Sequence, residues 1–287
     1  MATKGPEPEP TTIAGLPAIF APARGSRKQH TILFAHGLMC DHTFFDSWVS
    51  WFSAAGFDAY AVSRRGRQGK PPIDSRGVTF SDFLEDTCNP AQQLPHPLLL
   101  IGHSLGGILA LKAAEQNVCE ALVLLAPVPP RGILPLVGPR QLPPQLAQLT
   151  TVLTGGTFYP SLRQATAMFM GRIPAARRWD LYRRYTPDSG LALRSTYLPG
   201  ISVEPARVTI PLLCVVGAED ATIPPRSVGQ LAKRYGGECR NLPGHAHELV
   251  AEPGWEEVAS IVAAWADRIL PTIGPERDPG GATGAMA

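Results

Sequence analysis

Short apolar runs alternate with segments of helical periodicity along most of the chain. The runs, of five to seven residues each, cover Thr31–Ala35, Asp58–Val62, Pro97–Ile101, Ala121–Ala126, Ile210–Val216 and Glu238–Leu242. Between the first two runs, Phe44, Trp48 and Phe52 recur every four residues, as on one face of a helix. Similar patterns predict helices over Ser104–Glu115, Ser161–Met170, Ala175–Tyr185 and Pro253–Ile269. Strands that alternate with helices predict an α/β fold with a mostly parallel central sheet flanked by helices.

The alternation stops between residues 128 and 206. This stretch is too long for an ordinary connection between a strand and a helix. We therefore expect a helical cap subdomain over residues 128–206, inserted into a core made of residues 11–127 and 207–270. The two ends, residues 1–10 and 271–287, are rich in proline or in glycine, proline and alanine, and we expect them to be flexible tails.

The composition narrows the classes of protein to consider. With 26 basic and 24 acidic residues the formal net charge is +2, 44% of the residues are hydrophobic and 17% are charged. These values exclude a disordered chain, a coiled coil and a protein that coats nucleic acid. No apolar run reaches the roughly 18 residues of a membrane-spanning helix, so no membrane span is expected. Charged residues and prolines near the N-terminus argue against a secretory signal and favour a cytoplasmic protein.

Two further compositional features concern the cysteines and the expected cap. Five cysteines form no CxxC pair, so we expect buried reduced thiols with neither zinc nor disulfides. The expected cap is basic, with nine arginines against three acidic residues. These arginines could face an anionic substrate or carrier, or they could form a solvated helical face, which is the commoner use of surface charge. Eight apolar residues of the cap could line an acyl pocket or form the cap's own core: Leu134, Leu136, Val137, Phe158, Tyr159, Met168, Phe169 and Met170.

The clearest chemical signal lies where the run ending at Ile101 meets the predicted helix. Residues 102–106 read Gly-His-Ser-Leu-Gly, the G-x-S-x-G pattern of a nucleophile elbow. A sharp turn from strand to helix requires small residues two positions before and two after the serine, and glycine meets that requirement. Ser104 would then stand at a helix N-terminus, where the backbone N–H of Leu105 can stabilise an oxyanion.

A serine nucleophile requires a base, and the base requires an acid that orients it. Asp220 follows the predicted strand Ile210–Val216, on the loop at its carboxyl end, and is our candidate acid. A turn cap before Pro224 is the structural alternative for Asp220. The loop after Glu238–Leu242 supplies two candidate bases, His245 and His247, which the spacing alone does not separate.

Several separated motifs together resemble the α/β-hydrolase superfamily over roughly residues 30–270, with capped, cofactor-independent esterase-like members closest. Residues 34–38, Phe-Ala-His-Gly-Leu, resemble the family's His-Gly turn after its third strand. Residues 65–70, Arg-Gly-Arg-Gln-Gly-Lys, resemble its R-G-x-G-x-S loop, except that Gln and Lys replace small residues. The terminal pattern is similar too: His247 is followed by Glu252 and then by Pro-Gly-Trp at 253–255.

The resemblance implies roles for individual residues. It favours His247 over His245 as the base and implies that the backbone N–H of Leu38 forms the other half of the oxyanion hole, with Met39 as the fallback. It also places His36, His103 and Met39 beside the substrate, the two histidines in support of the oxyanion hole and the elbow. Neither metal nor cofactor is implied.

Together these features predict a serine hydrolase that cleaves a carboxylic ester or related acyl bond of a small apolar substrate. A thioesterase or acyl transferase, and a lyase or C–C hydrolase, would use the same triad. A ligand-binding relative without activity is a further alternative. The cluster of Arg64, Arg65, Arg67 and Lys70 could instead form a nucleic-acid patch, but its interleaved glycines suit a loop better, and no nucleic-acid partner is expected. The oligomeric state is left open.

Overall fold

The computed structural model describes residues 5–67, 75–134 and 149–269. The expected C-terminal tail, Lys70, Leu136, Val137 and Arg140 lie outside the described residues.

Eight described strands form one sheet in the order β1-β2-β4-β3-β5-β6-β9-β10. Their bounds are β1 Glu9–Ile13, β2 Leu16–Ala21, β3 Thr31–Ala35, β4 Asp58–Val62, β5 Leu98–His103, β6 Ala121–Leu125, β9 Leu212–Gly217 and β10 Glu238–Leu242. In this order, β4, β3, β5, β6, β9 and β10 run parallel to one another, whereas β2 is antiparallel to both β1 and β4. The prediction of a mostly parallel α/β sheet is confirmed, and the six expected strands appear within two residues of their predicted bounds.

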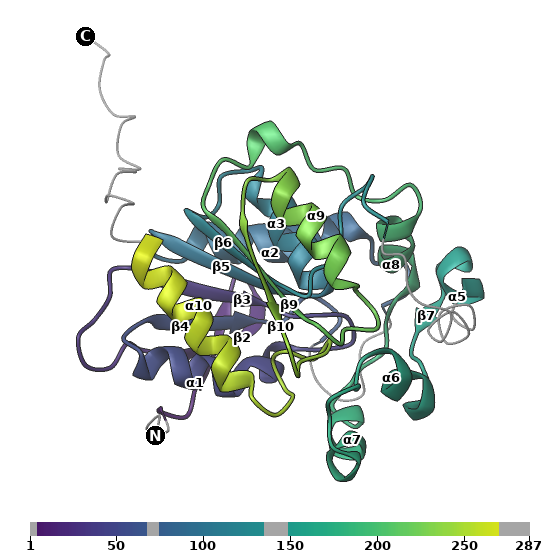
Figure 1. Ribbon diagram of the computed structural model, residues 1–287, viewed down its shortest axis with the longest axis horizontal. Helices are drawn as coiled ribbons and strands as arrows, with labels where there is room; N and C mark the ends of the chain where they lie inside the picture. The colour runs from purple at the N-terminus through teal and green to yellow at the C-terminus, as the bar shows by residue number, and fades with distance from the viewer. Residues whose placement is uncertain (1–4, 68–74, 135–148, 270–287) are drawn as a thin grey trace.

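Helices cover both faces of the sheet (Figure 1). They are α1 Asp46–Ala54, α2 Phe80–Gln93, α3 Leu105–Ala114, α9 Pro225–Arg234 and α10 Trp255–Ile269, with a short 3-10 turn η1 at His42–Phe45. Because successive side chains of a strand point to opposite faces, Ile32 and Phe34 join one buried cluster with α1 and α10. Leu33 joins the other cluster, with α2, α3 and α9. The sheet therefore has two apolar faces, and its strand ends are left to carry polar groups.

The N-terminal hairpin β1–β2 was not predicted. Four of the five residues of β1 are exposed, so this edge strand lacks the apolar pattern that marked the others. Residues 9 and 10, which we assigned to a tail, belong to it. Its turn places Ala14 and Gly15 at φ values of 51° and 76°.

The segment between β6 and β9, called the inserted segment below, is described over residues 126–134 and 149–211, and its helices α5 to α8 lie to one side of the sheet (Figure 1, teal to green). Its described elements are α5 Leu149–Thr154, β7 Thr157–Phe158, α6 Leu162–Met168, α7 Ala175–Tyr182, β8 Asp188–Ser189, α8 Gly190–Tyr197 and the turn η2 Pro205–Arg207. Phe158, Phe169 and Met170 of this segment are buried in one cluster with Met39 and Phe44, which follow β3. The inserted segment thus packs on the loop that begins at the end of β3.

Two of the eight apolar residues considered for an acyl pocket or for the cap's own core lie at the surface, since Leu134 is 71% exposed and Tyr159 40% exposed. All five cysteines are free thiols, four of them buried and Cys239 partly so. Over the described residues, no helix combines the length and the apolar character that crossing a bilayer requires.

Candidate active site

Ser104 occupies the turn between β5 and α3 in a strained backbone conformation, with φ 54° and ψ −115°. Positive φ is uncommon for a residue with a side chain and persists where the surroundings impose it. The glycines on either side are required by backbone contacts: a Cβ on Gly102 would lie 2.3 Å from the carbonyl oxygen of Gly106. A Cβ on Gly106 would lie 2.1 Å from the carbonyl oxygen of Ala35. This is the geometry of a nucleophile elbow.

His247 lies between Ser104 and Asp220. Its Nε2 is 3.1 Å from the Ser104 hydroxyl oxygen, and its Nδ1 is 2.9 Å from Oδ2 of Asp220. With its proton on Nδ1, the ring donates to Asp220 and leaves Nε2 free to accept the proton of Ser104. The other carboxylate oxygen of Asp220 accepts hydrogen bonds from the backbone N–H groups of Thr222 and Ile223, at 2.8 Å each. Asp220 therefore both caps its own turn and orients the imidazole.

The surroundings of His247 oppose each other in their effect on its pKa. Burial alone would lower the pKa, because a charged ring is poorly solvated there, but the nearby carboxylate of Asp220 and its hydrogen bond raise it. The net result is a pKa above the ordinary 6.5 of histidine. Asp220 thus makes the ring more basic than burial would permit.

The loop after β3 packs directly against the elbow. A Cβ on Gly37 would lie 3.3 Å from Cβ of Ser104 and 3.0 Å from Nδ1 of His103. Leu38 follows this glycine, and Leu105 begins α3, where a backbone N–H has no partner within its own helix. Among the described residues no acceptor binds the N–H of Leu38 or Leu105. The N–H of Met39, by contrast, donates to Oδ2 of Asp188 at 2.7 Å, so it is not available as the fallback donor.

The other histidines near Ser104 have internal partners. His36 donates from Nδ1 to the Gly37 carbonyl at 2.9 Å and accepts the Arg64 backbone N–H at Nε2, and burial lowers its pKa well below the ordinary value. His103 donates from Nε2 to the His247 carbonyl at 2.9 Å, and burial, with a smaller effect of the His247 ring, lowers its pKa to about 3. Both rings are neutral supports of the backbone. Each ring thus has a partner within the fold, and a place for either beside the substrate stays a prediction.

His245 is likewise held away from the serine. Its Nδ1 lies 3.0 Å from Oε1 of Glu252, and that same oxygen accepts the backbone N–H of Ala246. The glutamate of the terminal motif therefore fixes the loop on which His247 stands. Sequence spacing had marked Glu252 without indicating this contact.

The arginines of the loop after β4 do not form a surface patch. The side chains of Arg64 and Arg67 are 2% and 1% exposed and face the buried Asp188. Arg65 pairs with Asp82 and Asp86 of α2, at 2.9 and 2.7 Å. The three described arginines of the alternative nucleic-acid patch therefore have carboxylate partners within the fold, and Lys70 lies outside the described residues.

Several arginines of the inserted segment have local partners, as a solvated face would predict. Arg183 pairs with Asp180 at 2.6 Å, and Arg172 pairs with Glu219 at 3.6 Å. Arg184 donates to the Thr43 carbonyl at 2.6 Å and stacks over the Phe44 ring.

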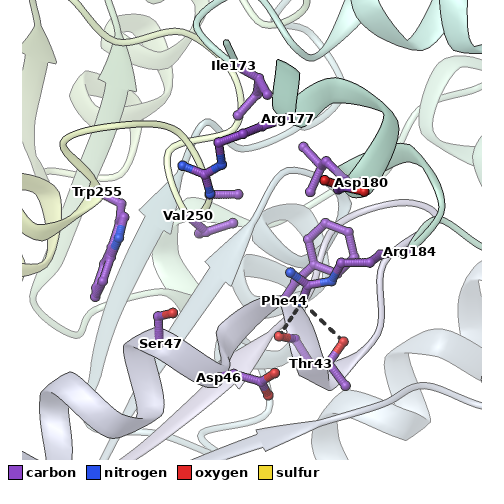
Figure 2. Close-up of a pocket in the computed structure, with 12 residues that line it drawn as sticks. Thr43, Phe44, Asp46, Ser47, Ile173, Arg177, Asp180, Arg184, Val250 and Trp255 are labelled. Atoms are coloured by element: carbon purple, nitrogen blue, oxygen red, sulfur yellow. Dashed lines mark hydrogen bonds between the residues drawn. The ribbon is translucent and has the colours of Figure 1, made fainter. Parts of the chain in front are cut away.

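A cavity of about 210 Å³ lies between α7 and the core, and Figure 2 shows residues that line it. Arg177, Arg184, Asp46 and Asp180 contribute charges of both signs to its lining, and Trp255 forms one wall. Ser104, Asp220 and His247 are not part of this lining.

Sequence reasoning missed two buried acids near the site. Asp188 had been counted only as a charge of the inserted segment, yet it is fully buried beside the loop after β3. Glu248 follows His247, and its Oε1 accepts the hydroxyl of Tyr185 at 2.7 Å. Burial raises the pKa of Glu248. Neither acid belongs to a motif, so only their long-range partners identify them.

In the described part of the chain, no group of three or more histidine, cysteine, aspartate or glutamate side chains is placed to hold a metal ion.

The sequence matches the model of the alpha/beta hydrolase family over residues 32–261. The chain belongs to this family. Among curated proteins, it is 33% identical over 121 residues to a Mycoplasma pneumoniae protein described as a candidate esterase/lipase. That match covers 40% of this chain and 43% of the relative, so the chain spans less than half the length of this relative.

Three solved structures of alpha/beta hydrolases show the same fold. A soluble variant of monoglyceride lipase from Saccharomyces cerevisiae, bound to a substrate analog, aligns with a TM-score of 0.71 at 18% identity, over 93% of this chain and 96% of that one. A monoacylglycerol lipase from Paleococcus ferrophilus gives 0.62 at 20% identity, over 86% and 97%. An esterase from Thermogutta terrifontis gives 0.64 at 16% identity, over 92% and 99%. The chain is thus an alpha/beta hydrolase similar in fold to esterases and lipases.

Proposed function

We propose that this alpha/beta hydrolase cleaves a carboxylic ester, or a related acyl bond, of a small apolar substrate through an acyl-enzyme on Ser104. The observation that carries the proposal is the unbroken series of contacts from the Ser104 hydroxyl through His247 to Asp220, at 3.1 and 2.9 Å. A serine at a strained elbow, with a base and an orienting acid in reach, is the arrangement that nucleophilic acyl transfer requires.

In the acylation step, Nε2 of His247 takes the hydroxyl proton while Oγ of Ser104 attacks the carbonyl carbon. The N–H groups of Leu38 and Leu105 stabilise the negative charge on the carbonyl oxygen, where one such donor contributes about 2.7–4 kcal/mol. The Asp220 carboxylate stabilises the imidazolium that forms. As the ester bond breaks, His247 gives its proton to the departing alkoxide, which diffuses away as the alcohol while the acyl group stays on Ser104.

In the deacylation step, a water molecule replaces the alcohol. His247 takes a proton from this water as its oxygen attacks the acyl carbon, and the same proton then returns to Oγ of Ser104 as the acid departs. The neutral ring is needed at the start of both steps. Activity is therefore expected to fall as the pH drops through the pKa of His247.

The apolar side chains that the inserted segment places near His247 favour an apolar substrate. The ring of Phe169 lies 5.5 Å from the His247 ring, and Met39, Phe44 and Met170 are buried in the same cluster. We propose that residues 128–206 act as a cap that covers the site and selects the acyl group. The local pairing of the cap arginines favours an uncharged substrate over an anionic carrier.

The test combines active-site labelling with turnover. Wild-type protein is treated with a fluorophosphonate probe, the labelled peptide is mapped, and hydrolysis of p-nitrophenyl butyrate is measured. Ser104→Ala should lose the label and lower kcat on the order of 10⁶-fold. Ser260→Ala is the matched control, because this residue is exposed and its hydroxyl donates to the Glu256 carbonyl of its own helix, at 2.7 Å. Wild-type turnover by Ser104→Ala, or a label on another serine, would refute the proposal.

The same protein can be assayed against an acyl thioester and with alcohol acceptors. If the thioester is turned over faster than the ester, the proposed substrate is a thioester and not an ester. Transfer of the acyl group to an alcohol in preference to water would make the protein an acyl transferase on the same three residues.

A further inference from the structure

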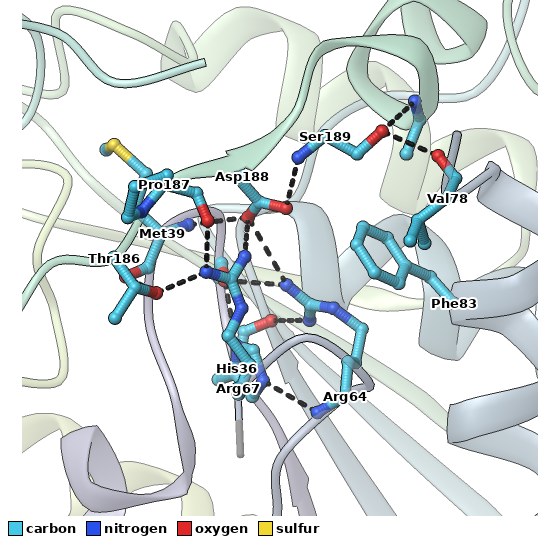
Figure 3. A network of polar contacts seen from close by, with 12 residues as sticks. His36, Met39, Arg64, Arg67, Val78, Phe83, Thr186, Pro187, Asp188 and Ser189 are labelled. Carbon is cyan, nitrogen blue, oxygen red and sulfur yellow. Dashed lines mark hydrogen bonds and ion pairs between the residues drawn. The ribbon is translucent and has the colours of Figure 1, made fainter. Parts of the chain in front are cut away.

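Asp188, at the start of β8 in the inserted segment, is the centre of a buried polar network (Figure 3). Its side chain is fully buried, and its Oδ2 accepts the backbone N–H of Met39 at 2.7 Å. The same oxygen is ion-paired with Arg67 and lies 3.9 Å from Nη2 of Arg64. Its Oδ1 accepts the N–H of Ser189 at 2.8 Å. One carboxylate therefore joins the inserted segment to the loops after β3 and β4.

Arg64 holds the peptide group that carries the Leu38 N–H. Its Nη2 donates to the Gly37 carbonyl oxygen at 2.9 Å, and its Nη1 donates to the His36 carbonyl oxygen. The Gly37 carbonyl and the Leu38 N–H belong to one planar trans peptide, so they point in opposite directions. Fixing the carbonyl toward Arg64 therefore turns the N–H of Leu38 away from it. Gly37 packs against Cβ of Ser104.

Asp188 holds the next peptide of the same loop. Met39 has a φ of 62°, a left-handed conformation that is unfavourable for a residue with a side chain. Its N–H meets the Asp188 carboxylate, and a hydrogen bond to a charged group is about twice as strong as one between neutral groups. Arg64 thus binds the peptide before Leu38, and Asp188 binds the peptide after it.

Stability alone does not account for this arrangement. Arg64 and Arg67 share one buried carboxylate, and Nε of each has no hydrogen-bond partner among the described residues. Buried ion pairs of this kind are often no more stabilising than apolar side chains of the same volume. Their directed bonds to the loop backbone, however, are what an apolar replacement could not supply.

We propose that Asp188 is a positioning residue that makes the oxyanion hole depend on the inserted segment. By holding the Met39 N–H and anchoring the two arginines, it keeps the N–H of Leu38 directed at the oxyanion beside Ser104. The inference rests on the proposed function, since it concerns the donor for that reaction. It adds that displacement of the inserted segment would disassemble half of the oxyanion hole.

The experiment compares Asp188→Asn with Ser189→Ala. Ser189 lies on the same strand and donates its hydroxyl to the Val78 carbonyl at 2.6 Å, so its loss loosens the same segment without touching Met39. For each protein, kcat and KM for p-nitrophenyl butyrate are measured, together with the affinity of butylboronic acid, which forms a tetrahedral anionic adduct with an active-site serine. The melting temperature reports any general loss of structure.

Because a displacement of about 1 Å can cost roughly 100-fold in rate, Asp188→Asn should lower kcat by roughly 10- to 100-fold with KM changed less than about threefold. The affinity for the boronic acid should fall by the same factor as kcat/KM. Ser189→Ala should stay within about threefold of wild type in both. If Asp188→Asn has the kcat and the boronic acid affinity of Ser189→Ala, or changes KM alone, the inference is wrong.

A neutral amide in place of the Asp188 carboxylate would leave the two arginines without a counter-ion, so Asp188→Asn combined with Arg67→Gln provides a second variant with the native buried net charge. The same loss of kcat is expected in it, and wild-type kinetics would overturn the inference. Wild type and Ser104→Ala are assayed in parallel. Normal wild-type turnover with unaffected Asp188 variants rejects this inference alone, whereas wild-type protein without Ser104-dependent turnover rejects the proposed function and the inference with it.

Discussion

The substitution Gly106→Ala tests whether the reactivity of Ser104 depends on the close approach of backbone at the elbow. The added Cβ would lie 2.1 Å from the Ala35 carbonyl oxygen and 2.6 Å from that of His36. Both atoms are backbone at the end of β3, so no side chain can move aside. Ordinary contact begins near 3.4 Å, and α3 would have to shift by about 1.3 Å relative to β3.

That shift determines the expected effects. Overpacking of a well-packed site costs roughly 1–3 kcal/mol in the free energy of unfolding. A nucleophile displaced by about 1 Å loses roughly 100-fold in rate, so kcat for p-nitrophenyl butyrate should fall by about that factor. Thermal unfolding and steady-state kinetics on the same preparation measure both effects, and the rate of labelling by a fluorophosphonate should fall in parallel with kcat.

Gly229→Ala is the matched control. This glycine lies inside α9, and its added Cβ would have no described atom within 4 Å outside the backbone of its own helix and its chain neighbours. Alanine is favoured over glycine within a helix by roughly 0.5–1 kcal/mol, so the control should be slightly stabilised and fully active. If Gly106→Ala kept the wild-type kcat, whatever its melting temperature, the close approach would not be what places the nucleophile, and the argument from the elbow would be refuted.

Two further predictions concern buried acids. First, Asp220→Asn should lower kcat by roughly 10⁴-fold. Because Asp220 opposes the effect of burial on the pKa of His247, the acid limb of the kcat/KM profile should also move from above pH 6.5 to lower pH. A measured acid limb that does not move would contradict the claim that Asp220 raises the pKa of His247. Tyr185→Phe should cost about 1–3 kcal/mol of stability by leaving buried Glu248 without its donor. Burial raises the pKa of Glu248 in the folded state, so the contribution of Glu248 to stability is present at low pH and lost as the pH rises through that pKa. Because the hydrogen bond from Tyr185 favours the ionised form of Glu248, Tyr185→Phe should lower the melting temperature more at high pH. An equal loss in melting temperature at pH 5 and pH 9 would contradict this prediction.

Much of the core could be predicted because its signals are local. Five of the six parallel strands, β4, β3, β5, β6 and β9, are apolar runs bounded by turns. The elbow is a contiguous pentapeptide, in which Gly102 is required by its close contact with Gly106. Asp220 could be proposed because the carboxyl ends of parallel strands meet at one edge of the sheet. The edge strand β1 was not predicted because most of its side chains face solvent, so it lacks the local apolar pattern on which the other predictions depend.

The position of the nucleophile therefore follows from residues adjacent in the chain, and its strained turn is already implied by the order strand, glycine, serine, glycine, helix. The contacts that orient its surroundings do not follow in this way. Asp188 is 149 residues from the Met39 amide that it accepts, and His247 is 143 residues from Ser104. Such pairs form only when the whole sheet and the inserted segment have packed, because burial, rather than any local pattern, selects which charge meets which backbone group.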